Sequence, residues 1–170
     1  MSAVGSSADG GQPTGPTARP PRYRAVTRRL DADPDLVAVA GDHGVLWDAR
    51  RVSLAGRGDA LTIALAPDVR RDPGRAAAAV GKVLGQIAVE DDLDLPGTGP
   101  VALGAWPFDP AAPADLTVPS VVVGRAEDGT RWATTVLDEG AGPADHDAAL
   151  DAVLADVAEQ AATAEQAGFA

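Results

Sequence analysis

Two segments with helical periodicity interrupt a chain that otherwise consists of short strand-like runs. In the first segment, Asp72 is a suitable N-cap, Pro73 fits the first helical position, and apolar residues recur at helical spacing as far as Ile87. The second helix is expected to begin near Asp145, which can cap it, and to end near residues 167–168, where a glycine acts as a stop. Its apolar stripe consists of Leu150, Val153, Leu154, Val157 and Ala161. The order strands, helix, strands, helix predicts an α+β fold, a mostly antiparallel sheet covered by two helices.

The strand-like runs are separated by turn residues. The stretches 41–44 and 127–129 are expected to form turns, because their glycines can adopt positive φ angles. Pro119 should lie at a strand edge or a bulge, since it has no N–H to donate. The expected strands are 23–30, 36–40, 45–47, 52–55, 56–65, 101–105 and two strands within 116–136.

The chain divides into a tail and one domain. Residues 1–21 are rich in Gly, Pro and Ser and are expected to be a disordered tail, whereas residues 22–170 have the pattern of a folded domain. The N-terminus lacks the apolar segment of a signal peptide, and no run of about 18 apolar residues predicts a membrane span. The chain has no cysteine, which excludes disulfides and thiolate metal sites. We therefore expect a cytoplasmic location.

Charge is distributed unevenly along the chain. Residues 1–82 contain 12 basic and 9 acidic residues, whereas residues 83–170 contain 2 basic and 16 acidic residues. A surface that follows nucleic-acid phosphates needs clustered Lys and Arg, so the acidic half argues against nucleic acid as a partner.

Two acidic clusters resemble cation sites but fit poorly. Asp31, Asp33 and Asp35 have the spacing of the first ligands of a calcium loop, but Leu36 stands where such a loop needs glycine and Asp42 stands where it needs glutamate. A solvated turn is the better interpretation. The second cluster, which consists of Glu90, Asp91, Asp92 and Asp94, is interpreted as a solvated linker rather than a cation site.

Other candidate groups lack catalytic context. His43 and His146 have no nucleophile motif near them, and the single lysine, Lys82, is expected to be a surface residue at the edge of a helix. The segment 57–59 reads Arg-Gly-Asp and is expected to be a turn, and 97–104 is rich in glycine but lacks the lysine of a phosphate loop. On residues alone we assign no catalytic residue, no cofactor-binding residue and no metal ligand.

One segment resembles a known family. The sequence GAWPFDPAAPADLTVP (104–119) resembles the P-F-D-P segment of isochorismate synthases, which are chorismate-utilising enzymes. The segments 44–63, 96–110 and 121–136 extend the resemblance, especially to actinobacterial-type members, so that it covers about residues 22–165. It implies that this chain has the fold of the N-terminal part of those enzymes.

The resemblance also implies what this stretch of chain lacks. Family members convert chorismate to isochorismate with a lysine base, a glutamic acid and glutamates that bind Mg²⁺, all C-terminal to the matched region. None of these residues has a matching position here, so the chain is expected to be inactive alone and to hold no cofactor itself. The sequence leaves open whether the pathway is the biosynthesis of menaquinone or of a siderophore.

By resemblance, the P-F-D-P segment is expected to be architectural. Pro107 and Pro110 would fix the backbone, Trp106 and Phe108 would anchor it in apolar surroundings, and Asp109 would accept nearby N–H groups in an Asx turn. The less favoured alternative is that this segment lines a substrate cavity.

Three hypotheses remain open. The chain is the N-terminal part of an isochorismate synthase from a truncated or split reading frame, or it is a stand-alone module that binds a separate catalytic chain of the chorismate family. The third is an enzyme of another class that uses Asp42, Asp109 or Glu127. Under the first hypothesis, strands 101–105 and 121–125 should lack partners, which would favour self-association.

Overall fold

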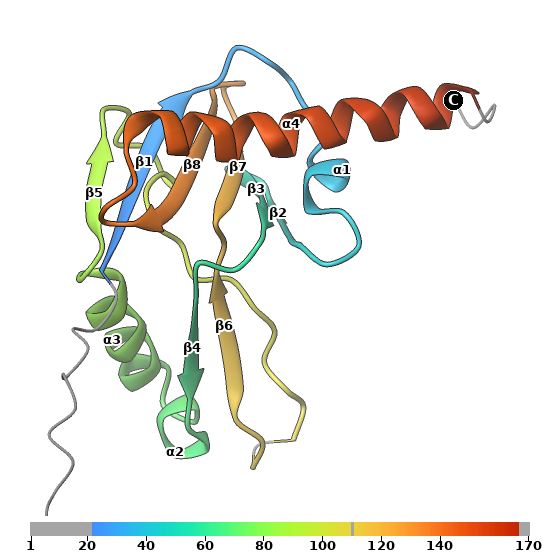
Figure 1. Cartoon of the computed structure of the whole chain (residues 1–170). Coiled ribbons are helices and arrows are strands. Elements are labelled where there is room, and N and C mark those ends of the chain that lie inside the picture. Colours follow the sequence, from blue (N-terminus) through green and yellow to red (C-terminus); the bar gives the residue numbers. More distant parts are fainter. Residues whose placement is uncertain (1–21, 110, 167–170) are drawn as a thin grey trace, which may run out of the picture.

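The computed structural model describes residues 22–109 and 111–166, and Figure 1 shows how their strands and helices are arranged. Within these residues the chain forms a six-stranded sheet, a two-stranded sheet and four helices. The predicted tail at 1–21 and the predicted helix end at 167–168 lie outside the described residues.

The larger sheet has the strand order β2-β3-β7-β8-β1-β5. Every neighbouring pair is antiparallel except β1 and β5, which are parallel. The fold is therefore α+β with a mostly antiparallel mixed sheet, as the order of elements predicts. Its strands are β1 (Tyr23–Arg29), β2 (Val45–Ala49), β3 (Val52–Arg57), β5 (Ala88–Asp91), β7 (Val121–Ala126) and β8 (Arg131–Asp138).

The smaller sheet pairs β4 (Leu61–Leu65) with β6 (Ala114–Val118) in antiparallel fashion. Pro119 and Ser120 separate β6 from β7, so the chain leaves one sheet and enters the other at the proline, which needs no N–H partner there. Pro119, expected at a strand edge or a bulge, lies in the two-residue break between the two strands. The predicted pair of strands within 116–136, joined by a turn at 127–129, is confirmed as the hairpin β7–β8, although residues 116–118 belong to β6.

Helices α4 (Pro143–Gln166) and α1 (Leu36–Ala40) cover one face of the larger sheet (Figure 1). Helix α4 begins two residues before the expected position, and Asp145 in its first turn accepts the N–H of Gly142 at 2.8 Å. The core on this face consists of Leu36, Val39, Ala40, Ala55, Val123, Ala133 and Val157.

A buried tryptophan forms the centre of the core on the opposite face of the sheet. Trp132 on β8 is completely buried and its indole N–H donates to the carbonyl of Gly97 at 3.3 Å. Its ring occupies the space above Gly124 on β7, where a Cβ atom would collide with it. Leu54 and Val122 complete this core.

A third core lies between the two-stranded sheet and α3 (Pro73–Leu84), which follows the short helix α2 (Pro67–Arg70). Asp72 caps α3 as predicted, because its carboxylate accepts the N–H groups of Gly74 at 2.9 Å and Arg75 at 3.1 Å. The buried residues here are Ala25, Ile63, Leu65, Ala76, Ile87, Leu116, Val118 and Val136.

The predicted strand at 36–40 is wrong, because these residues form α1. Asp35 caps this helix by accepting the N–H of Val37 at 2.9 Å. A helical turn also places Leu36, Val39 and Ala40 on one buried face, whereas a strand would divide them between two faces.

The structure also corrects the expected unpaired strands. Residues 121–125 belong to β7, which pairs on both sides, and 101–105 contributes a single bridge between Leu103 and Thr117. Residues 88–91, expected at the end of a helix and the start of a linker, form β5 beside β1. The outer strands of the larger sheet are therefore β2 and β5.

Within the described ranges, none of the helices combines the length and the hydrophobicity that a bilayer crossing requires.

Candidate functional site

Arg70, the last residue of α2, binds the main chain of residues 104–109, which we call the aromatic loop. Its Nη1 donates to the carbonyl of Pro107 at 2.9 Å, and its Nη2 donates to the carbonyl of Asp109 at 2.6 Å. The guanidinium carbon also lies 5.9 Å from the ring centroid of Trp106, within the range of a cation–π interaction. One side chain thus fixes three residues of the loop.

The two aromatic side chains of this loop face outward. Trp106 is 51% exposed and Phe108 is fully exposed. The expectation that they anchor the segment in apolar surroundings is therefore wrong, since Arg70 holds the loop instead. A fixed loop that presents large apolar side chains to solvent is a feature of interaction surfaces.

Asp109 has the structural role that the sequence predicts. Its Oδ1 accepts the N–H of Ala111 at 2.8 Å, which is an Asx turn, and its carbonyl accepts the N–H of Ala112 at 3.2 Å. Pro110, for which a backbone role is expected, lies outside the described residues.

Two of the three aspartates with calcium-loop spacing, Asp33 and Asp35, have different structural roles. Asp33 accepts hydrogen bonds from Arg125 at 2.6 Å and from Arg131 at 2.8 Å. The hydrogen bond from Arg131, reinforced by the charges of both arginines, lowers the pKa of Asp33 below its ordinary value. Asp35 caps α1, so these carboxylates form no calcium loop.

The cluster at 90–94 is not a solvated linker alone, because its first two residues belong to β5. Glu90 lies 3.9 Å from Arg28, and Asp91 accepts the N–H of Leu93 at 3.0 Å. In the part of the chain that the structure describes, no three histidine or acidic side chains converge as a metal site would require.

The two histidines occupy opposite environments. His43 is exposed in the turn between α1 and β2. His146 on α4 is buried, and its Nδ1 lies 2.6 Å from the hydroxyl oxygen of Thr135. Burial, followed by the charges of Arg24 and Arg28, lowers the pKa of His146. Its enclosure by α4 and β8 suits packing rather than contact with a substrate.

The remaining candidates lie in separate parts of the surface. Lys82 is exposed in the last turn of α3, as predicted. Arg57 forms an ion pair of 2.5 Å with Asp156, and Gly58 turns the chain with a φ of 68°. Glu127 lies in the β7–β8 turn, 3.9 Å from Arg50. None of these contacts places one candidate residue as a general base beside another as a general acid.

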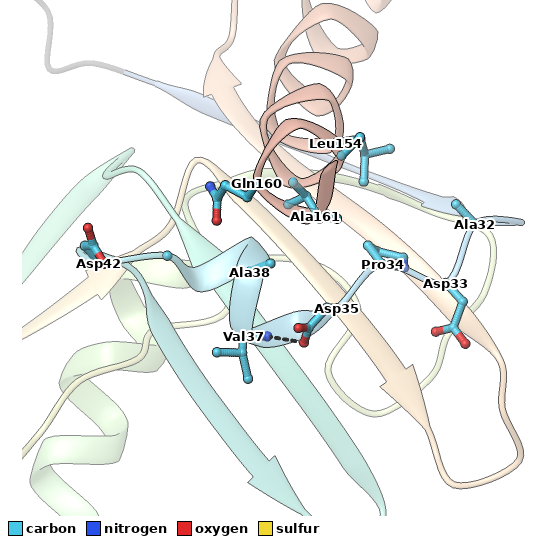
Figure 2. Close-up of a pocket in the computed structure, with 13 residues that line it drawn as sticks. Ala32, Asp33, Pro34, Asp35, Val37, Ala38, Asp42, Leu154, Gln160 and Ala161 are labelled. Carbon is cyan, nitrogen blue, oxygen red and sulfur yellow. Dashed lines mark hydrogen bonds between the residues drawn. The ribbon is translucent and has the colours of Figure 1, made fainter. Parts of the chain in front are cut away.

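A hollow lies between residues 32–42 and the C-terminal half of α4, and we call it the α1–α4 hollow. Its volume is about 710 Å³. Figure 2 shows Leu154 and Ala161 of α4 facing the segment that carries Pro34 and Ala38. Asp42, one of the carboxylates considered above, lies at its margin.

Sequence reasoning missed the role of Arg70. Its partners lie 37 and 39 residues further along the chain, and a lone arginine between a valine and a second arginine matches no motif. The only sequence signal for an unusual loop is the aromatic pair Trp106 and Phe108 next to a turn, because an exposed loop is rarely so apolar.

Comparison of this chain with models of protein families, with characterised proteins and with solved structures finds no match.

Proposed function

We propose that residues 22–166 form the N-terminal, non-catalytic part of an isochorismate synthase-like enzyme. In this proposal, the lysine base, the glutamic acid and the magnesium-binding glutamates of the chorismate reaction come from a catalytic part that packs against this chain. The resemblance of residues 104–119 to the P-F-D-P segment of that family motivates the assignment.

The aromatic loop is the observation that carries the proposal. Arg70 makes two hydrogen bonds to its main chain, so its conformation is set before any partner arrives. Trp106 and Phe108 nevertheless remain outside every described core. Exposed aromatic side chains on a preformed loop are suited to a large interface, because burying them requires little additional ordering.

The sheet edges provide further support. Leu46 and Trp47 on β2 are 45% and 55% exposed, and Val89 on β5 is 55% exposed. Edge strands have unpaired main-chain groups, and apolar side chains on them favour contact with another protein surface. If β2 and β5 were covered in a larger enzyme, their exposed apolar side chains and unpaired main-chain groups would both gain partners.

The chemistry of the described residues is consistent with a supporting role. Conversion of chorismate to isochorismate needs a base and an acid held together at the substrate. His146 is enclosed between α4 and β8, and Lys82 lies on the solvent side of α3. Among the described residues, neither forms a hydrogen bond or an ion pair with a carboxylate that could complete such a pair.

The alternative is a stand-alone module that binds a separate catalytic chain of the chorismate family. The same aromatic loop would then form an interface between two polypeptides rather than within one. Mixing this chain with such a catalytic chain and measuring isochorismate formation would distinguish the two arrangements.

A chimera tests the proposal. The N-terminal part of an active isochorismate synthase is replaced by residues 22–166, and isochorismate formation from chorismate and Mg²⁺ is measured by chromatography. We expect the chimera to be active, and we expect Phe108→Lys in the same chimera to abolish activity while the matched Ala162→Lys variant, at an exposed site outside the aromatic loop, retains it. A folded but inactive chimera would contradict the proposal.

A further inference from the structure

The apolar stripe of α4 continues beyond the sheet that it covers. Leu150, Val153 and Val157 pack in the core, and Val157 also lines the α1–α4 hollow together with Leu154, Ala158 and Ala161. Beyond Val157, every described side chain of α4 is exposed. Figure 1 shows the helix continuing past α1, so this part of the stripe has no cover among the described residues.

The shape of the hollow suits a helix. Ala158 and Ala161 are small, so a second helix can approach α4 closely, at the interaxial distances of about 8–10 Å that packed helices adopt. Residues 154–166 of α4 extend for about 20 Å at the rise of an α-helix, which is long enough for three to four turns of contact. Val37 on the opposite wall is 64% exposed and offers an apolar contact to the same partner.

The acidic residues around the hollow favour a basic helix as the partner. Residues 31–42 contain four aspartates and residues 143–166 contain six acidic residues, and neither segment contains a lysine or an arginine. Three aspartates line the hollow: Asp33 is paired with Arg125 and Arg131, whereas Asp35 and Asp42 form no ion pair with any described residue. Glu165 follows Ala161 by four residues and so lies on the same side of α4.

We propose that the α1–α4 hollow is a docking site for a basic amphipathic helix of a partner protein. The partner's apolar face packs on Leu154, Ala158, Ala161 and Val37, and its lysines or arginines lie beside Asp35 and Asp42. A second copy of this chain is a poor occupant, because its net charge of −11 opposes the acidic walls. The site shares no residue with the aromatic loop, so the inference is independent of the proposed function.

The test uses a synthetic helical peptide of about 18 residues, composed of Lys, Leu and Ala with its leucines on one face. A peptide with Glu in place of Lys is the charge control. Binding is measured by calorimetry at low and at physiological salt, and amide shifts in the NMR spectrum locate it. The matched variants are Ala158→Lys and Ala161→Lys, which place a cation in the hollow, and Ala162→Lys, which places one on an exposed site of the same helix that does not line the hollow.

We expect the basic peptide to bind and to shift the amide signals of Val37, Ala38 and Ala161. Its affinity should fall as salt is added. Ala158→Lys and Ala161→Lys should each weaken binding about tenfold or more, and Ala162→Lys less than about twofold. Equal effects of Ala161→Lys and Ala162→Lys, or equal binding of the acidic peptide, would overturn the proposal. Self-association of the chain that Ala161→Lys abolishes and Ala162→Lys preserves would also overturn it, since the occupant would then be a second copy.

Discussion

Arg70 donates a hydrogen bond of 2.9 Å to the main-chain carbonyl of Pro107, which lies 37 residues further along the chain. The contact joins α2 to a loop whose aromatic side chains point away from the cores. It gives the loop a fixed conformation that hydrophobic burial does not supply, and it makes the loop the feature on which the proposed function depends.

Loss of Arg70 should loosen the aromatic loop without unfolding the domain. Arg70→Ala removes both hydrogen bonds to the loop, and we expect amide hydrogen exchange at residues 104–112 to accelerate while the overall free energy of unfolding falls by only about 1–2 kcal/mol. Arg71→Ala is the matched control, because Arg71 is adjacent and exposed. Equal exchange in both variants would show that Arg70 does not hold the loop.

Phe108 should matter for interaction and not for stability. Its side chain is fully exposed, so Phe108→Ser should change the free energy of unfolding by less than about 0.5 kcal/mol in urea denaturation. A loss of more than twice that amount would mean that the ring is buried in solution and that the aromatic loop is not an open surface.

Gly124 should be the least replaceable glycine of the larger sheet. The indole of Trp132 occupies the position of a Cβ atom on residue 124, so Gly124→Ala requires the buried ring to move. We expect a loss of about 2–3 kcal/mol in the free energy of unfolding, measured by urea denaturation.

Gly81→Ala supplies the control of opposite sign. Gly81 lies within α3, and apart from the neighbouring backbone of its own helix a Cβ atom at this position would meet no atom within 4 Å. Alanine there should therefore stabilise the domain by about 0.5–1 kcal/mol. A stable Gly124→Ala variant would show that Trp132 does not pack against β7 as described.

His146 should make the domain less stable in mild acid. Because burial lowers the pKa of His146 in the folded state, the unfolded state binds its proton first as the pH falls below about 6.5. The contribution of neutral His146 to the free energy of unfolding is therefore fully present above the unfolded-state pKa and is lost as the pH falls. For one proton, the free energy of unfolding changes by at most about 1.4 kcal/mol per pH unit.

Urea denaturation between pH 7.5 and pH 5.5 measures this slope. The slope should decrease in His146→Gln and persist in His43→Gln, which changes the exposed histidine. The lowered pKa of Asp33 acts in a more acidic range, below its ordinary value of 3.8, and so does not interfere. An unchanged slope in His146→Gln would contradict the burial of its ring.

Local signals predicted local structure well. The Asp72–Pro73 start of α3 follows from side-chain capping and a fixed φ angle, and the structure confirms both. The apolar run at 36–40 is predicted as a strand and is a helix in the structure, because five apolar residues suit one helical turn as well as a buried strand. The cap at Asp35 and the packing of α1 beside α4 stabilise the helix. The packing is a contact with residues far along the chain.

The surfaces were harder to predict than the elements. The pairing of β5 with β1 and the hydrogen bonds of Arg70 are both long-range, so no pattern within a short window indicates them. For the same reason, sequence reasoning singled out the aromatic residues of the P-F-D-P segment but assigned them to a core. The predicted stripe of α4 names Leu150, Val153 and Val157, which pack in the core, and Leu154 and Ala161, which line the α1–α4 hollow, but it omits Ala158. Only the structure shows that the sheet ends before the stripe does.

The most direct test of the central proposal is the rate of isochorismate formation by the chimera that carries residues 22–166 in front of a catalytic part. We predict turnover by the chimera, loss of turnover on Phe108→Lys, and no turnover by residues 1–170 alone with chorismate and Mg²⁺. Formation of isochorismate by the 170 residues alone, or a folded chimera without activity, would contradict it.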